Sequence, residues 1–517
     1  MFRFFIHKKI KILIIFFFIA YFNNLYAETV STDVILVSGE DSRKTITEDL
    51  TVTSSGRIHC EDINQCIVAN DDNLTIINHG TISNDDTDGN DIDILIKANA
   101  DALDIKIYNY GTMEVDGNSA IFIPNNDDND GDGVGAYIYN EGTIKSGRFF
   151  TIRYHGDAEA DSANKTKIDN YGTITTDSTG GLTFYGYNDD DTIINNYSGG
   201  TISAPNGPGA IHTLEDDGTN TPSTSLTINN WGTIKANTDT IEMGVSSTLN
   251  NYGSIITTTV SDQAVLMQGN NNTVNLYDGT ILEGYLDADK YSGSTLNLDL
   301  CSSYYFKVSG TWTVNNISGC GELVYSGGFA QSISPLFQSV ADEIGALRTD
   351  LINDVYDFAK DKMENNESFG LPLKSYTKRE RGKSINKFAS NANGFAFGFP
   401  SENDKIKGHL VFNFLNNNID LLNQNIKDET YQVGFFLENL NAKVVFGYHD
   451  YNGDRTRLNN TVSGGKESIK QDHKSFSSII GTQFSKKLNN NSYIECKLDS
   501  NIEGFFNHEE SDHVKWQ

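Results

Sequence analysis

Short stretches of alternating apolar and polar residues recur along the chain from residue 28 to residue 284, and most copies centre on the motif Asn-x-Gly-Thr-Ile. The glycines of successive copies are separated by 31, 31, 30, 28, 32, 21 and 26 residues. A constant motif with drifting spacing indicates one structural unit per copy, with loops that absorb the insertions. Regular or near-regular copies begin at Asn78, Asn109, Asn140, Asn170, Asn230 and Asn251, a copy with two extra residues begins at Asn196, and a degenerate copy begins at Tyr277.

Each copy contains three runs that fit β-strands. An alternating run such as Leu74 to Ile76 precedes the asparagine, Thr-Ile begins a second run, and a third apolar run follows. Three short strands in about 30 residues predict a right-handed parallel β-solenoid, whose turns must stack because no single turn buries its own core. The alternatives are a β-sandwich and a β-propeller, although propeller blades need four strands per unit. The motif glycine is expected to adopt a positive φ and turn the chain sharply.

Two further segments follow the repeat. Residues 285–333 predict strands that cap the solenoid, because exposed strand edges aggregate. Residues 334–364 predict a linker helix, since Ser334-Pro335 fits a helix start. An apolar stripe with helical spacing follows that start, at Phe337, Val340, Ile344, Leu347, Leu351, Val355 and Phe358.

The last segment, residues 371–517, alternates again, but in longer runs. Examples are Gly394 to Phe399 and Tyr431 to Phe436, and asparagine-rich turns separate the runs. Apolar residues facing lipid that alternate with small or polar residues facing a lumen are typical of outer-membrane strands. We therefore expect an all-β chain that ends in an antiparallel outer-membrane β-barrel. Only about seven strands fit before residue 517, so the barrel is expected to be incomplete.

Charge changes the picture in two ways. The chain has 39 basic and 69 acidic residues and a net charge of −30, which argues against nucleic acid as a partner because phosphate binding needs a basic face. The charge is also uneven. Residues 28–330 carry a net charge of −31, whereas residues 331–517 carry −3, which indicates a domain boundary near residue 330.

The first 27 residues predict an export signal. Basic residues from Arg3 to Lys11 precede an apolar run from Ile12 to Phe22, which is short for a membrane span. An N-terminal anchor helix is the alternative. Export would place the remaining chain in an oxidising compartment, where cysteines can pair. Cys60, Cys66, Cys301 and Cys320 are the candidates for two disulfides, Cys496 is left over, and spacing alone does not define the connectivity.

The repeat motif itself suggests two rows of side chains. Its asparagines are expected to stack their amides into a hydrogen-bonded ladder. The residue after the asparagine is usually aromatic, which predicts a row of rings at Tyr110, Tyr171, Tyr197, Trp231 and Tyr252. These rings either bind a ligand such as a sugar or cover the edge of the solenoid by offset stacking.

Candidate chemistry is sparse. Asp128, Asp130 and Asp132 alternate before Gly133, which is half of a calcium loop, but Tyr139 occupies the twelfth position, where a bidentate glutamate is expected. Ca²⁺ is therefore the one cofactor considered, and solvated acidic loops are the alternative. The sequence has no nucleophile elbow, zinc-protease motif or phosphate-binding loop. A solenoid enzyme remains an alternative because polysaccharide-cleaving enzymes use this fold.

The order of signal peptide, Asn-x-Gly-Thr-Ile solenoid, helix and alternating strands resembles the autotransporters of Gram-negative bacteria. The resemblance covers nearly the whole chain and is architectural. It implies a barrel in outer-membrane lipid, insertion by the barrel assembly machinery, a helix that threads the barrel, and a solenoid passenger at the cell surface. Family barrels have twelve strands and end on an aromatic residue, so this chain departs from the pattern.

These expectations lead to one interpretation and two alternatives. The interpretation is a self-secreted surface protein whose passenger serves adhesion or another interaction with a glycan or protein ligand. The alternatives are a polysaccharide-acting solenoid enzyme and a truncated remnant that is not secreted. An enzyme should have a groove that holds two or three carboxylates on adjacent coils, with at least one perturbed pKa, whereas an adhesin should have no buried acid pair on the solenoid face.

Overall fold

The structure is a computed structural model, which describes residues 27–510 apart from internal gaps. The gaps comprise residues 38–42, 62, 86–92, 100–103, 125–134, 156–165, 188–191, 214–224, 319–321, 327, 334–347, 361, 363–364, 382–385, 404–405, 422–423, 438–439 and 490–491. The expected signal peptide, apart from Ala27, therefore lies outside the described residues.

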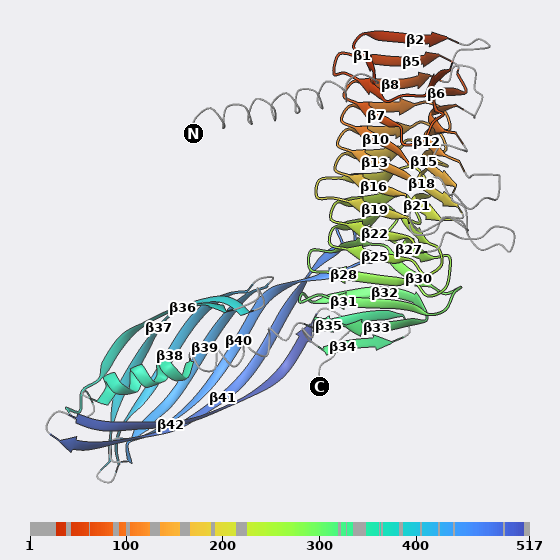
Figure 1. Cartoon of the computed structure of the whole chain (residues 1–517). Helices are drawn as coiled ribbons and strands as arrows, with labels where there is room; N and C mark the ends of the chain where they lie inside the picture. The colour runs from red at the N-terminus through yellow and green to blue at the C-terminus, as the bar shows by residue number, and fades with distance from the viewer. Residues whose placement is uncertain are drawn as a thin grey trace, which may run out of the picture.

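The described chain is almost entirely β-structure, in a solenoid followed by a long-stranded sheet (Figure 1). Three parallel sheets run along the solenoid, and each coil adds one strand to each sheet. The first sheet contains β1 (Glu28–Val30), β4 (Leu50–Val52), β7 (Thr75–Asn78), β10 (Ile105–Asn109), β13 (Ala136–Asn140), β16 (Lys167–Asn170), β19 (Ile193–Asn196), β22 (Thr227–Asn230), β25 (Thr248–Asn251), β28 (Thr273–Tyr277), β31 (Ser294–Asp299) and β33 (Trp312–Asn316).

The second and third sheets follow the same order. The second contains β2 (Asp33–Val37), β5 (Arg57–Glu61), β8 (Thr81–Asp85), β11 (Thr112–Val115), β14 (Thr143–Ser146), β17 (Thr173–Thr176), β20 (Thr201–Ala204), β23 (Thr233–Ala236), β26 (Ser254–Thr257) and β29 (Ile281–Glu283). The third contains β3 (Lys44–Ile46), β6 (Gln65–Ala69), β9 (Ile94–Ala98), β12 (Ser119–Ile123), β15 (Phe150–His155), β18 (Leu182–Tyr187), β21 (Gly209–Thr213), β24 (Ile241–Met243), β27 (Gln263–Met267), β30 (Tyr285–Ala288) and β32 (Tyr304–Gly310).

The register of these sheets places equivalent motif residues directly above one another. Ile144 pairs with Ile174, and the same column continues through Ile202 to Ile234. All four isoleucines are at most 2% exposed and belong to one continuous hydrophobic core. The parallel solenoid predicted from the repeat is thus confirmed, and stacked aliphatic columns hold the coils together.

At Gly111, Gly142 and Gly172, glycine is required for close packing between coils and not for a positive φ. Among the described glycines, positive φ values occur at Gly199, Gly279 and other turns, but not at Gly111, Gly142 or Gly172. A Cβ on Gly142 would overlap with the carbonyl oxygen of Gly111 in the preceding coil, and Gly172 meets the carbonyl of Gly142 in the same way. The expectation of a positive φ is therefore wrong for Gly111, Gly142 and Gly172, although it holds at Gly279 in the degenerate copy. Glycine is required because the turns stack too closely for a side chain.

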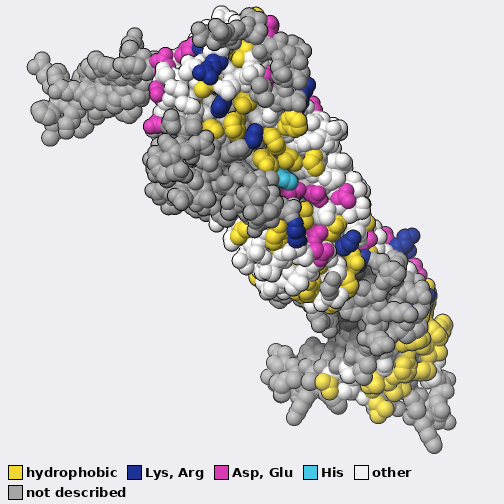
Figure 2. All heavy atoms as spheres, turned by 90° about the vertical axis from the view of Figure 1, so that its right-hand side faces the viewer, with side chains coloured by type: hydrophobic (Ala, Val, Ile, Leu, Met, Phe, Trp, Pro, Cys, Tyr) yellow, Lys and Arg dark blue, Asp and Glu magenta, His cyan; other side chains and the backbone are white. Residues whose placement is uncertain are grey.

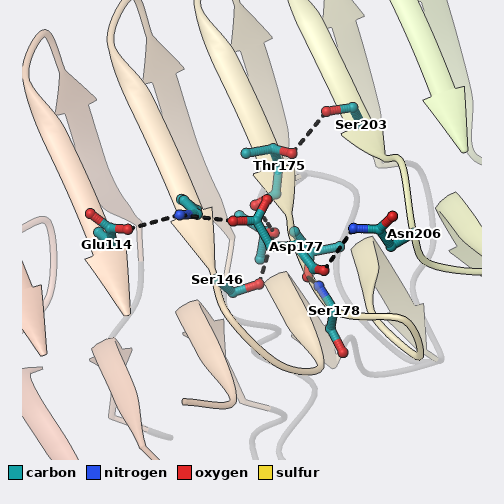
Figure 3. A network of polar contacts seen from close by, with 10 residues as sticks. Glu114, Ser146, Thr175, Asp177, Ser178, Ser203 and Asn206 are labelled. Atoms are coloured by element: carbon teal, nitrogen blue, oxygen red, sulfur yellow. Dashed lines mark hydrogen bonds and ion pairs between the residues drawn. The ribbon is translucent and has the colours of Figure 1, made fainter. Parts of the chain in front are cut away.

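Polar side chains on the second sheet also join neighbouring coils (Figure 3). The Lys145 ammonium lies 3.0 Å from Glu114 Oε1 and 2.8 Å from Asp177 Oδ2, so one cation bridges three coils. The hydroxyl of Ser203 donates to Thr175 Oγ1 at 2.8 Å. Hydrogen bonds to Asp177 and Glu114 raise the pKa of Lys145, which keeps this bridging cation charged.

Parallel stacking continues beyond residue 284, into the segment expected to be a cap. β30 and β32 extend the third sheet, and β31 and β33 extend the first. A hairpin of β34 (Glu322–Ser326) and β35 (Phe329–Ile333) then follows, and β35 pairs in antiparallel orientation with β32. The change from parallel to antiparallel pairing marks the end of the repeating architecture.

The C-terminal part is an antiparallel sheet of long strands with a helix against one side (Figure 1). The strands are β36 (Phe369–Arg381), β37 (Asn386–Asn403), β38 (Ile406–Leu421), β39 (Gln424–Leu437), β40 (Ala442–Asn459), β41 (Lys466–Asn489) and β42 (Ser492–Glu510), each paired with the next. The connecting helix spans residues 348–360, inside the segment expected to be helical. Of the described helices, none is long and apolar enough to cross a membrane.

Candidate functional site

The sequence-predicted calcium site cannot be located. Asp128, Asp130 and Asp132 lie outside the described residues, so the Ca²⁺ site stays a prediction. Within the described ranges, no group of three or more His, Cys, Asp or Glu side chains could hold a metal ion.

The cysteine candidates divide between described and undescribed segments. Cys60 and Cys66 form a disulfide, with their Cα atoms 5.7 Å apart. Cys301 is also disulfide-bonded, whereas Cys320 lies outside the described residues. The first bond joins β5 to β6 and closes a short loop between the second and third sheets.

The row of aromatic rings expected along the turn is present. Tyr171 stacks on Tyr197 with ring centroids 4.1 Å apart and planes 3° from parallel. Trp231 stacks between Tyr197 and Tyr252 at 5.5 and 5.4 Å. Glu141 interrupts the row, and Tyr139 from the neighbouring strand fills the gap, 5.7 Å from Tyr110 and 5.5 Å from Tyr171. His79 and Tyr277 extend the row at its two ends.

This stacking limits what the rings can bind. From Tyr171 to Tyr277 the rings are nearly parallel and cover one another's faces, so this part of the row presents ring edges to solvent. Less than half of the surface of each of two rings, Trp231 (40%) and Tyr171 (42%), is exposed to solvent. Burial raises the pKa of Tyr197 to about 12, which keeps its hydroxyl protonated at physiological pH. A sugar ring finds no free face between the rings of this stacked part, so the geometry there favours the covering role.

The asparagine ladder is confirmed, and a second ladder accompanies it. In the first, Asn109 donates to Asn140 and Asn140 donates to Asn170, each at 2.8 Å and fully buried. The second lies on the solvent side of the first sheet, where Asn250 donates to Asn229 at 2.8 Å. It runs through Asp169, Asn195, Asn229, Asn250, Asn275, Asn297 and Asn315. The asparagine that directly precedes the motif in several copies was the available sequence signal.

The outer side of the third sheet carries a face that the sequence did not single out. The register aligns Lys97, Phe122, Arg153, Tyr185 and His212 along one line. The Arg153 guanidinium lies 5.0 Å from the ring centroid of Phe122, and Tyr185 stacks with His212 at 5.8 Å. Apolar and basic side chains gather on this face nearer the N-terminal coils, and acidic side chains lie farther along the solenoid (Figure 2). We call this line of side chains the third-sheet face.

Carboxylates from adjacent coils continue the third-sheet face. His212 Nδ1 lies 2.8 Å from Glu242 Oε1, and Gln268 Nε2 donates to Glu242 Oε2 at 3.0 Å. Asp239, just before β24, is next to this pair. Burial, with repulsion from Glu242 and Asp262, raises the pKa of Asp239 to about 6. This group therefore exchanges a proton near neutral pH, which is a common property of acid–base sites.

The C-terminal sheet exposes aromatic residues on one side and buries a mixture of polar and apolar residues on the other. On the side away from the helix, large apolar side chains are exposed on successive strands, including Phe395, Phe397, Phe399, Phe412, Tyr431, Phe435, Phe446 and Phe476. On the helix side, polar residues such as Asn417, Thr430 and His449 are buried.

The buried polar residues form a network with the helix. Arg348 Nη2 donates to Asp428 Oδ1 at 2.9 Å and also to the Tyr451 hydroxyl, and both charged groups are at most 2% exposed. The hydroxyl of Thr430 donates to Asp428 at 3.0 Å. The helix residues Ile352, Val355 and Tyr356 also pack against apolar residues of the sheet. The helix thus lies against the sheet as part of a shared core.

Comparisons with known proteins add no information to the geometry described above. No protein-family model matches the chain, and searches of curated proteins and of solved structures found no match.

Proposed function

We propose that this chain is a self-secreted surface protein. Its C-terminal sheet would anchor in outer-membrane lipid, after insertion by the barrel assembly machinery, and its solenoid would be presented at the cell surface. The observation that carries the proposal is the sidedness of β37–β41, which expose aromatic residues on the side away from the helix and bury polar together with apolar residues on the helix side.

The physical reason is the surrounding medium that such a sheet needs. In water, a continuous exposed apolar surface is unfavourable by roughly 25 cal/mol for each Å², and soluble monomers rarely expose large patches. In lipid, the same side chains are in a favourable medium, while the polar residues on the helix side suit an interior shielded from lipid. The backbone groups of the inner strands β37–β41 are satisfied by pairing on both sides, as a lipid-embedded sheet requires.

Charge insertion on the apolar side tests the anchor. In cells of a Gram-negative host, Phe397→Lys should reduce the amount of protein in the outer-membrane fraction, because lysine in the lipid midplane costs about 2–4 kcal/mol. Ile35→Lys is the control, since Ile35 is 56% exposed, against 49% for Phe397, but lies on the solenoid. Equal fractionation of both variants and the wild type would refute the lipid anchor. Protease treatment of intact cells would show whether the solenoid is outside.

The displayed solenoid would serve adhesion or another surface interaction, with a glycan or a protein as the ligand. The third-sheet face supports this part, because it combines half-buried rings with a cation and a histidine, a composition typical of interaction surfaces. Cells that display Arg153→Gln should bind immobilised glycans or proteins less than wild-type cells. Lys235→Gln, on the second sheet, is the matched control. Unchanged binding by Arg153→Gln would remove this face from consideration.

A polysaccharide-acting enzyme is the second candidate. The observation in its favour is the set of carboxylates from adjacent coils, Asp239, Glu242 and Asp262, with one pKa raised to about 6. Purified protein would be incubated with a panel of polysaccharides, and new reducing ends would be measured. Activity should disappear in Asp239→Asn and Glu242→Gln and persist in Asp33→Asn, an exposed control. Absence of new reducing ends with every polysaccharide would rule against this candidate.

A further inference from the structure

The turn between β40 and β41 lies against the last coils of the solenoid, although it belongs to the C-terminal sheet (Figure 1). Two residue pairs, Tyr304 with Leu458 and Tyr305 with Asn459, join β32 and β40 in parallel orientation. The Leu458 amide donates to the Ser303 carbonyl at 2.9 Å, and the Gly284 amide donates to the Asn460 carbonyl at 2.8 Å. Backbone hydrogen bonds therefore cross from the solenoid to the sheet.

The side chain of Asn460 imitates the next strand of the solenoid. The backbone amide of Lys307 donates to Asn460 Oδ1 at 2.8 Å, and Asn460 Nδ2 donates to the Lys307 carbonyl at 3.0 Å. Asn460 is fully buried. One amide side chain thus satisfies both polar groups of one β32 residue, which leaves no exposed ladder position there.

Apolar contacts accompany these hydrogen bonds. Leu458 is 8% exposed and belongs to the hydrophobic core of the solenoid, whereas the helix and the interior of the C-terminal sheet form a separate core. The Arg457 guanidinium lies 5.1 Å from the ring centroid of Tyr305. Gly465 has a φ of +61°, and a Cβ there would press on Ile281 and on the backbone of Leu282. The turn approaches β29 as closely as a side-chain-free residue allows.

We propose that residues 457–465 are a docking element that completes the last coils of the solenoid core and holds the solenoid to the C-terminal sheet independently of the chain connection. The partner is a segment of the same chain, and the inference does not depend on where the sheet resides. Two consequences follow. The terminal coils need this turn for their stability, and the solenoid stays attached when residues 334–347 are cut.

Hydrogen exchange in detergent-solubilised full-length protein tests the first consequence. Leu458→Ala and Asn460→Ala should accelerate exchange in β29, β30 and β32 by at least about tenfold, because each leaves a cavity or unsatisfied buried groups. Exchange in β10–β23 should stay at the wild-type rate, which shows that the solenoid is folded. Asn452→Ala is the control, since Asn452 is exposed on the same strand. Wild-type rates in β29, β30 and β32 of the docking variants would overturn the proposal.

A cleavage experiment tests the second consequence. A site-specific protease sequence is inserted within residues 334–347, the protein is cut, and the fragments are separated by size. The wild-type fragments should elute together, and those of the double variant Leu458→Asp/Asn460→Ala should elute apart. Separation of the wild-type fragments, or joint elution of the variant fragments, would contradict the proposal. If the protease does not cut the inserted site, the hydrogen-exchange experiment alone tests the proposal.

Discussion

Asn140 and Gly142 lie in the same turn of one coil and stabilise the stack by different means. Asn140 is fully buried and exchanges hydrogen bonds with the asparagines above and below it. Gly142 has no side chain and therefore permits the backbone of the preceding coil, at Gly111, to approach. Because both residues act between coils, each substitution is expected to weaken the stack locally.

Gly142→Ala should destabilise the solenoid. The added Cβ would overlap with the Gly111 carbonyl, so neighbouring coils must separate, at a cost of about 1–3 kcal/mol. Gly180→Ala is the control, because a Cβ there meets nothing within 4 Å. Its effect should stay within about 0.5 kcal/mol. Thermal unfolding followed by circular dichroism would compare the two, and equal melting temperatures would show that the coils tolerate the Cβ.

Asn140→Ala should cost more than Asn250→Ala, although each removes two ladder bonds of about 2.8 Å. The loss at Asn140 removes the donor to Asn170 Oδ1 and to the Gly142 and Thr173 carbonyls inside the stack, at a cost of about 2–4 kcal/mol. The ladder of Asn250 is half-exposed, so water replaces the lost partners, and we expect about 0.5–1 kcal/mol. Denaturant unfolding of both variants measures the difference, and a reversed order would contradict this reasoning.

At the scale of elements, the third sheet brings together titratable side chains from neighbouring coils. β21 contributes His212, β24 contributes Glu242, and the turn before β24 contributes Asp239. The first sheet, in contrast, presents mostly uncharged amides in the C-terminal coils. The sheets therefore differ in chemistry although they share one backbone repeat.

The raised pKa of Asp239 makes the stability of the solenoid depend on pH. Its folded-state pKa of about 6 lies above the usual 3.8, so the folded state binds the proton more tightly. This contribution is fully present below about pH 4 and is lost as the pH rises through 6. Asp239→Asn should therefore stabilise the protein by about 1–2 kcal/mol at pH 7 and leave it nearly unchanged at pH 4. Melting curves at both pH values test this, and an equal gain at pH 4 would argue against it.

The packing of the connecting helix against the sheet depends on one buried ion pair. Arg348 and Asp428 are both buried, so Arg348→Met should destabilise the helix seat by about 3–5 kcal/mol, because the carboxylate loses its cation in a buried place. The double variant Arg348→Met/Asp428→Leu should recover most of the loss, since it removes the buried charge as well. Unfolding in detergent would be compared across the three proteins. A double variant less stable than Arg348→Met would contradict the argument.

At the scale of the whole molecule, two hydrophobic cores meet at one place. The solenoid core runs along the coils, and the helix with the C-terminal sheet forms the second core. Among the described residues of the long-stranded sheet, Leu458 is the one that belongs to the solenoid core. The net charge of −31 over residues 28–330 keeps the solenoid surface acidic, whereas the near-neutral C-terminal part exposes aromatic residues.

Much of the fold could be predicted from periodicity, while the candidate site could not. The period of the motif located the coils from Asn78 onward, but the coils before it lack the full motif, and those after Gly279 belong to the segment expected to be a cap. The aromatic row was predictable because its members occupy one motif position. The third-sheet face was not, because Arg153, His212 and Glu242 share no motif, and loops of different length separate them.

The sequence by itself determined the all-β class, the three strands per coil, the buried asparagine ladder and the long alternating strands, since each follows from a local pattern repeated many times. Only the tertiary structure decided which outward side chains meet and where the solenoid joins the sheet. Lys307 and Asn460 are 153 residues apart, and no periodic pattern connects them. A local pattern dictates which side of a strand faces the core, but contacts between distant segments depend on how whole elements stack, and stacking depends on the sum of all intervening turns.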